Sequence, residues 1–201
     1  MGCGMSGNAA FVTCGTDEEC AKLCLELARR GFSVGFTHQP DDAGAPELAS
    51  QIESLGVSAL ALPVGRTCPE LAAGLSAAVV RTAEEFGGID ALFFLSPAEA
   101  GGGELLLDLD EEDWDAAMDA APKGFFLLCK YALPYLISRV GARVVVLDAG
   151  GDDPNLVESA SREALKKVAE VVSEELSSYG VSVVRKKISS AGWIGECSDS
   201  L

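Results

Sequence analysis

Short apolar runs alternate along this chain with longer stretches in which apolar residues recur at helical spacing. The runs have the length and character of buried strands, and they span residues 9–14, 32–37, 57–62, 89–95, 142–147 and 181–184. The helical stretches span residues 17–30, 46–55, 69–86, 108–137 and 155–179, the last beginning at Asn155 or Glu158. Strict alternation, with strands apolar throughout, predicts an α/β fold with a doubly wound, Rossmann-type parallel sheet between helices.

The longest predicted helix, residues 108–137, carries the clearest end signals. Asp110 is a good N-cap residue, and the acidic run Glu111–Asp113 suits the first turn, where exposed backbone N–H groups favour negative charge. The helix should therefore begin at Asp110 or Glu111. Pro122 removes one intrahelical hydrogen bond, so we expect a kink there.

Composition favours one well-cored domain. With 201 residues, 48% hydrophobic residues and 22 glycines, we expect a single domain over residues 9–187, a flexible tail over 1–8 and a second tail over 188–201. The net charge of −16 repels phosphate backbones and anionic lipid surfaces. Nucleic acid and membranes are therefore not expected partners.

Cysteine usage bears on the compartment. An odd number of cysteines, seven, with no signal peptide and no apolar run near 20 residues, predicts a cytoplasmic protein. Cys14, Cys20 and Cys24 could cluster, but their spacing fits no common metal site, so we expect them to be buried and reduced. The start Met1–Ser6 also fits an acylation pattern, although a plain tail is the simpler interpretation.

Several phrases resemble the short-chain dehydrogenase/reductase (SDR) family. They include Leu109–Trp114, Lys123–Leu127 and Ala132–Pro134 in the long helix, together with Gly87–Leu92 and Arg143–Val146. The resemblance extends over roughly residues 9 to 187. It implies a Rossmann-type fold in which the long helix carries a catalytic Asn and forms half of a subunit interface. Because the chain ends at Leu201, we expect an SDR fold truncated at its C-terminus, with little room for a seventh strand.

The cofactor positions depart from the family. Its glycine-rich turn, Thr-Gly-x-x-x-Gly-x-Gly, corresponds to Thr13–Cys20, where only Gly15 is kept and Cys14, Glu18 and Cys20 stand at glycine positions. Glu18 also places negative charge where a diphosphate would lie. We therefore expect no NAD(P) binding and no cofactor.

The catalytic positions depart as well. By the resemblance, Glu158 stands at the Tyr position and Arg162 at the Lys position, while Ala149 replaces the Ser and Ala121 the Asn. Glu158 and Arg162 are four residues apart, which also suits an ordinary ion pair on a helix surface, so we predict no catalytic set. His38 and the carboxylates Asp148, Asp152 and Asp153 look like surface loop residues, and no metal site is expected.

The helix over 110–137 has more apolar residues than one buried face requires. We therefore expect a subunit interface formed by the helices over 110–137 and 158–179, through Phe125, Leu128, Ala132, Ala164, Val168 and Val171.

The predicted function is a non-catalytic SDR-like subunit, not itself an enzyme, that stabilises or shapes an active SDR partner. A precedent by resemblance is the inactive subunit of the heteromeric dehydrogenase that acts on a CoA thioester in anaerobic toluene degradation. Two alternatives stay open: a cofactor-free enzyme resembling halohydrin dehalogenases, of whose catalytic set only Arg162 is present, and a stand-alone ligand-binding or regulatory module.

Overall fold

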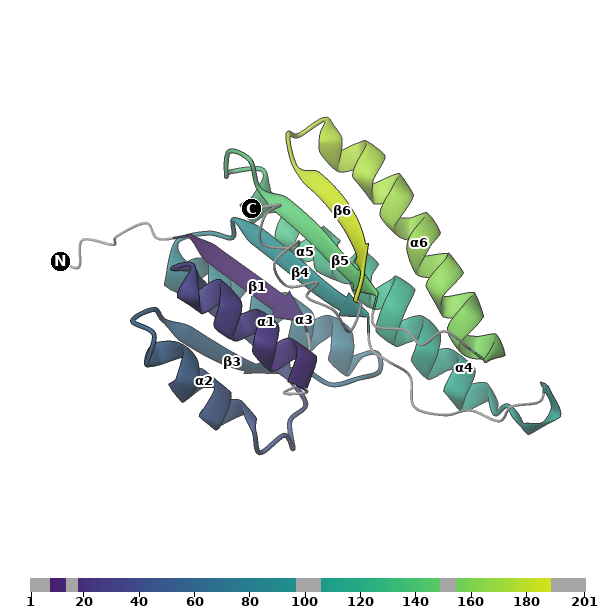
Figure 1. Cartoon of the computed structure of the whole chain (residues 1–201). Coiled ribbons are helices and arrows are strands. Elements are labelled where there is room, and N and C mark those ends of the chain that lie inside the picture. Colours follow the sequence, from purple (N-terminus) through teal and green to yellow (C-terminus); the bar gives the residue numbers. More distant parts are fainter. Residues whose placement is uncertain (1–7, 14–17, 97–105, 149–154, 189–201) are drawn as a thin grey trace.

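The computed structural model describes residues 8–13, 18–96, 106–148 and 155–188, and its centre is one parallel sheet (Figure 1). The strands follow the order β3-β2-β1-β4-β5-β6, and every neighbouring pair is parallel. This arrangement confirms the predicted fold class. The strand bounds are β1 Ala9–Thr13, β2 Ser33–His38, β3 Ala59–Pro63, β4 Ala91–Ser96, β5 Arg143–Asp148 and β6 Ser182–Lys187.

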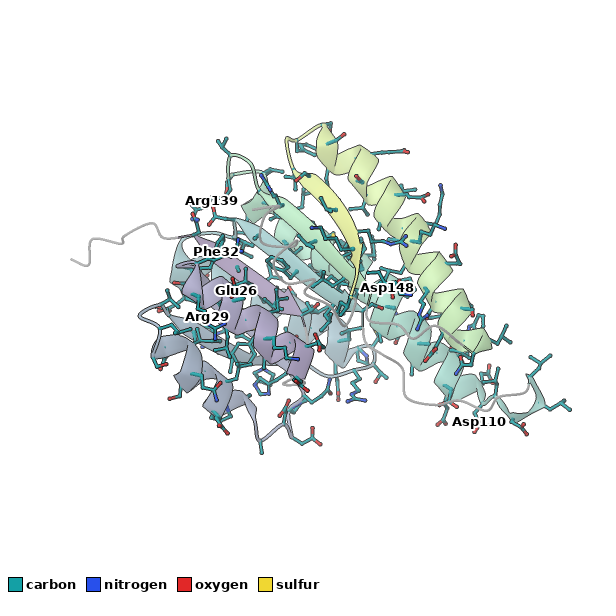
Figure 2. The ribbon with its side chains drawn as sticks, in the orientation of Figure 1. Glu26, Arg29, Phe32, Asp110, Arg139 and Asp148 are labelled. Carbon is teal, nitrogen blue, oxygen red and sulfur yellow. The ribbon has the colours of Figure 1, made fainter. Side chains whose placement is uncertain are left out.

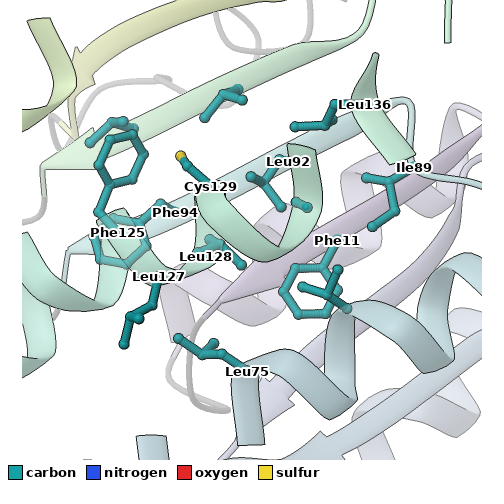
Figure 3. Packing of buried hydrophobic residues seen from close by; sticks show 14 of the residues in the cluster. Phe11, Leu75, Ile89, Leu92, Phe94, Phe125, Leu127, Leu128, Cys129 and Leu136 are labelled. Carbon is teal, nitrogen blue, oxygen red and sulfur yellow. The ribbon is translucent and has the colours of Figure 1, made fainter. Parts of the chain in front are cut away.

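Helices cover both faces of the sheet. The face of the sheet that carries Phe11, Leu92 and Phe94 packs against α3, α5 and α6 (Figures 1 and 3). The opposite face packs against α1 and α2. The central strands are therefore apolar on both sides, as parallel strands between helix layers require. The helix bounds are α1 Glu18–Arg29, α2 Ala45–Glu53, α3 Glu70–Phe86, η1 Leu106–Asp108, α4 Glu111–Met118, η2 Asp119–Lys123, α5 Gly124–Leu136 and α6 Leu156–Ser177.

The predicted long helix is continuous but irregular. It runs from α4 through the π turn η2 into α5, and Pro122 lies inside the π turn. Proline cannot donate a backbone hydrogen bond, so a widened turn at this position agrees with the expected kink. Asp110 is the N-cap of α4 but its side chain makes no capping bond, whereas Asn155 caps α6 by accepting from the backbone N–H of Glu158 at 2.9 Å.

The face of α5 that packs on the sheet differs from our expectation. Phe125, Leu128 and Ala132 were predicted to contact another subunit, but all three are buried within this chain. Phe125 makes an edge-to-face contact with Phe94 of β4, with ring centroids 5.3 Å apart (Figure 3). The interface prediction is wrong for these three residues, because a side chain enclosed by the sheet cannot reach a partner. Phe126, the next residue, is 48% exposed.

Strand β6 is longer than predicted. Its charged residues Arg185, Lys186 and Lys187 continue the pairing with β5, where Val146, Leu147 and Asp148 are their register partners. The apolar run ends at Val184, so hydrophobicity alone could not show this extension. Among the described helices, none is long and apolar enough to cross a membrane.

We predict that Phe125 and Phe126 contribute very differently to folding. Phe125→Ala should lower the free energy of unfolding by about 3–5 kcal/mol, since it leaves a cavity between α5 and the sheet. Phe126→Ala, at a half-exposed site on the same helix, should cost under about 1 kcal/mol. Urea unfolding followed by circular dichroism measures both. Equal losses would show that the two faces of α5 are assigned wrongly.

Candidate functional site

The carboxyl ends of the parallel strands provide the place for a site. In an open α/β sheet, ligands bind beyond these ends, where neighbouring strands send their connections to opposite faces. Here that point lies between β1 and β4, which pair directly at the centre of the sheet. Thr13 ends β1 and donates its hydroxyl to the carbonyl of Phe93 at 3.4 Å, and the buried Ser96 ends β4.

Strand register adds a polar row at the same edge. Ser96 of β4 is the register partner of Asp148, and Asp148 is the partner of Lys187 on β6. Asp148 lies at the carboxyl end of β5 (Figure 2). Asp148 was expected to be a surface loop carboxylate, but it is the last residue of a strand. Ser96 was not singled out from the sequence, and only its register with Asp148 reveals it.

The first turn of α1 belongs to the segment that corresponds to the family's glycine-rich turn, where a diphosphate would lie. Glu18 pairs with Lys22 at 2.7 Å, and Lys22 also reaches Glu19 at 3.3 Å. The hydrogen bond from Lys22 holds the pKa of Glu18 below its usual value, so this turn carries negative charge at neutral pH. Backbone N–H groups at a helix start attract phosphate only if nothing else offsets them. The described residues of this turn therefore disfavour the binding of a diphosphate.

The thiols of α1 differ from the reduced cluster that we expected. Cys20 is fully buried and disulfide-bonded, and its Sγ lies 3.9 Å from the Sγ of Cys24, which is buried and not part of a disulfide. Cys14 lies outside the described residues. Within the described ranges, no three His, Cys, Asp or Glu side chains group in a way that could hold a metal ion.

Glu158 and Arg162 form an ion pair at 3.5 Å in the first turns of α6. Their side chains are only 17% and 21% exposed, whereas the neighbouring pair Glu163 and Lys166 is 73% and 43% exposed. We expected a solvated surface pair, and the structure instead shields it. The buried Ser161 hydroxyl donates to the carbonyl of Glu158 at 3.2 Å, which further fixes this turn.

The other two positions that correspond to catalytic residues of the family, Ala121 and Ala149, have no side chain that could form a hydrogen bond. Ala121 is buried in η2, and its methyl group cannot donate a hydrogen bond. Ala149, Asp152 and Asp153 lie outside the described residues. His38 is the last residue of β2, so it lies at the end of a strand and not in a loop. Its Nδ1 lies 2.7 Å from the carbonyl oxygen of Gln39.

Comparison with known proteins identifies relatives over most of the chain. The model of the short chain dehydrogenase family matches residues 8–187. A short-chain dehydrogenase/reductase from Cladobotryum, FrzI, is 30% identical over 87% of this chain and 67% of its own length. The hydroxynaphthalene reductase arp2 of Aspergillus fumigatus is 29% identical over 72% of this chain and 50% of its own length. The 3-oxoacyl-[acyl-carrier-protein] reductase FabG of Staphylococcus aureus is 22% identical over 80% and 65%. The chain thus spans about half to two thirds of these relatives.

Solved structures share the fold. The NADH-dependent reductase A1-R' complexed with NAD superposes with a TM-score of 0.78 at 23% identity, covering 89% of this chain and 76% of that one. The acetoin dehydrogenase YohF from Salmonella typhimurium superposes with a TM-score of 0.77 at 23% identity, covering 89% and 74%. At such identities the likeness concerns the fold alone.

We predict that the acidic start of α1 weakens nucleotide binding. Calorimetric titration with NADH should give a Kd weaker than about 100 μM. Glu18→Gln with Glu19→Gln should tighten it a few-fold, because the repulsion between like charges is removed but was screened by solvent. The matched control is Glu163→Gln, a carboxylate on α6. An unchanged Kd in the double variant, or binding tighter than about 100 μM by the original chain, would refute this assignment.

The comparisons also correct our functional expectation. We predicted a non-catalytic subunit, with the other readings of a cofactor-free enzyme or a binding module left open. That prediction is wrong, because the relatives in sequence are named as reductases and dehydrogenases. With its family model matched over residues 8–187, this chain belongs to the short-chain dehydrogenase family.

Proposed function

We propose that this chain is an oxidoreductase that interconverts a hydroxyl group and a carbonyl group, with Glu158 carrying the proton. The observation behind the proposal is the shielded pair of Glu158 and Arg162 at 3.5 Å. Support for the reaction class comes from the relatives, which are named as reductases. A carboxyl group kept from bulk water is a suitable proton carrier, since general acids and bases act best in a fixed and partly dry position.

The position of Glu158 suits this role. The first turn of α6 lies on the side to which the carboxyl ends of the strands point (Figure 1). Asn155 caps this turn through the backbone of Glu158, and α6 packs against η2, which holds Ala121. In this proposal, α6 is the rigid helix that presents Glu158 toward that edge of the sheet.

Arg162 acts on Glu158 and not on the substrate in this proposal. A guanidinium cannot lose its proton at ordinary pH, so Arg162 offers constant positive charge and several donors to the carboxylate. In the oxidation direction, the substrate hydroxyl would give its proton to a Glu158 oxygen, while its carbon would pass a hydride to a nicotinamide nucleotide, which is thereby reduced. In the reduction direction, Glu158 returns that proton to the carbonyl oxygen. The proposal concerns this proton step only.

An association surface is a second part of the proposal. With Phe125, Leu128 and Ala132 in the core, the candidate contacts shift to the outward face of α5 and to α6. Phe126 on α5 and Val171 on α6 are 48% and 51% exposed, while Ala164 and Val168 are half-buried. We propose that an SDR-family subunit, which includes a second copy of this chain, covers these residues. Cytoplasmic location likewise stays a prediction.

We predict that Glu158→Gln lowers kcat at least about 100-fold, because glutamine cannot exchange the proton. Arg162→Met should lower kcat by a similar order, and Glu163→Gln with Lys166→Met, an exposed pair on the same helix, should stay within a few-fold. The assay follows NADH or NADPH at about 1 mM, well above a weak Kd, against aliphatic and aromatic carbonyl compounds. Full activity in Glu158→Gln, or no turnover of any compound by the folded chain, would overturn the proposal.

We also predict that a charge on the outward face of the α5 and α6 layer separates the subunits without unfolding them. Phe126→Asp and Val171→Asp should each halve the mass in light scattering, since a buried unpaired charge opposes association. Leu55→Asp, which charges an exposed apolar site on the loop after α2, is the control. If both variants keep the mass of the original chain, the interface lies elsewhere.

A further inference from the structure

A groove between α6 and β6, whose lining does not include Glu158, brings together side chains of both charges. Figure 1 shows α6 running alongside β6, and the two elements pack against each other. The groove encloses about 340 Å³, near the lower end of the roughly 300–1,000 Å³ that is typical of small-ligand pockets. Its charged lining residues are Lys166, Glu170 and Glu174 of α6 and Arg185 of β6. It therefore has room for a small ligand and charged groups to hold it.

Two of these charged groups are already paired. Lys166 Nζ lies 3.2 Å from a carboxylate oxygen of Glu163. Lys167 Nζ lies 3.0 Å from a carboxylate oxygen of Glu170. The hydrogen bond from Lys167 holds the pKa of Glu170 below its usual value, so Glu170 is ionised at neutral pH. Lys166 and Glu170 therefore contribute to the electrostatic field of the groove, but each has a neighbour on α6.

The other two charged groups have no partner within the part of the chain that the structure describes. Arg185 and Glu174 form no ion pair and no side-chain hydrogen bond there, either with each other or with another described residue. The hydroxyl of Ser173, also on the groove, makes no such bond, whereas the hydroxyls of Ser177 and Ser178 bond back to carbonyl oxygens of α6. A guanidinium, a carboxylate and a hydroxyl are thus available to a ligand in one groove.

The signs of these charges restrict the ligand. The carboxylates on the groove would repel a plain anion, and its cationic groups would repel a plain cation. A molecule with both a carboxylate and an ammonium group satisfies both, because a guanidinium can bind a carboxylate through two N–H groups and a carboxylate accepts from an ammonium group. Ala169, which is 4% exposed, and the half-buried Val183 add an apolar wall for a hydrocarbon side chain.

We propose that this groove binds a free apolar α-amino acid. The carboxylate of the ligand pairs with Arg185, and its ammonium group pairs with Glu174. The Ser173 hydroxyl donates to the same ligand carboxylate, and the ligand side chain lies against Ala169 and Val183. This assignment uses no residue of the proton-transfer proposal, so it holds whether or not Glu158 carries a proton.

The test follows the backbone amide signals of the full, isotopically labelled chain by NMR during titration with L-leucine. Leucine should shift amide signals of α6 and β6 around the groove, with a Kd of about 1 mM. N-acetyl-leucine keeps the carboxylate but has no positive charge, and leucine methyl ester keeps the ammonium group but has no negative charge. Each should bind at least about tenfold more weakly than leucine, because one charge-assisted contact is lost.

Two variants with matched controls assign the charges. Arg185→Met and Glu174→Gln should each weaken leucine binding about tenfold. The controls are Arg81→Met, at an exposed site on α3, and Glu175→Gln, which removes a neighbouring carboxylate outside the lining of the groove. Both controls should leave the Kd unchanged. Glu174→Gln should not weaken the binding of N-acetyl-leucine, because that ligand has no ammonium group.

Three outcomes would overturn the proposal. They are the lack of a saturable shift with leucine up to about 10 mM, binding of N-acetyl-leucine as tight as that of leucine, and equal losses in Glu174→Gln and Glu175→Gln. Unchanged amide signals away from the groove show that each variant is folded. No enzymatic activity is measured, so a failure of the proton-transfer proposal would leave this result untouched.

Discussion

The rest of the structure depends on covering both faces of a parallel sheet. Strands joined by crossover helices lie between two layers, so their side chains must be apolar on both sides. Helix α5 meets this need at the centre of one face, where Phe125 packs against Phe94 of β4. Helix α5 continues directly from η2, and η2 packs against α6, the helix that carries Glu158. The same packing that closes the core therefore positions Glu158.

The sequence was sufficient for the fold because the signals were periodic. Alternation of strand and helix predicted the doubly wound sheet, and Pro122 predicted an irregular turn. The sequence could not predict which face of α5 is buried, because Phe125 and Phe126 are adjacent and equally apolar. Only the position of the sheet decides which of them is enclosed. Strand β6 was predicted too short for the opposite reason. Arg185–Lys187 are charged, yet β6 is the last strand of the sheet that the described residues form, and such a strand tolerates charge while its backbone pairs on one side.

The site was partly within reach of sequence reasoning. The resemblance located Glu158 and Arg162, but their spacing is the same as that of any pair four residues apart on a helix. Glu158 and Arg162 are less exposed to solvent than Glu163 and Lys166. This difference comes from how α6 packs, which no local sequence pattern reveals. Asp119 at the start of η2 accepts a hydrogen bond from the backbone N–H of Cys68, 51 positions away, and this contact is likewise invisible before folding.

The acidic start of α1 disfavours a bound dinucleotide, whereas the relatives of this chain are named as reductases. The solvent exposure of the acidic side chains determines how strongly they oppose binding. The Glu18 side chain is 82% exposed and is already paired with Lys22. Charges in such a position are screened by water and salt, and a lysine beside them offsets part of their field. The turn therefore weakens the binding of a diphosphate without excluding it. Glu158 lies in the opposite regime, because its carboxylate is largely shielded and its interactions are screened much less. Changes at Glu158 should thus affect the chemistry, while changes at Glu18 should affect only how tightly a nucleotide is held.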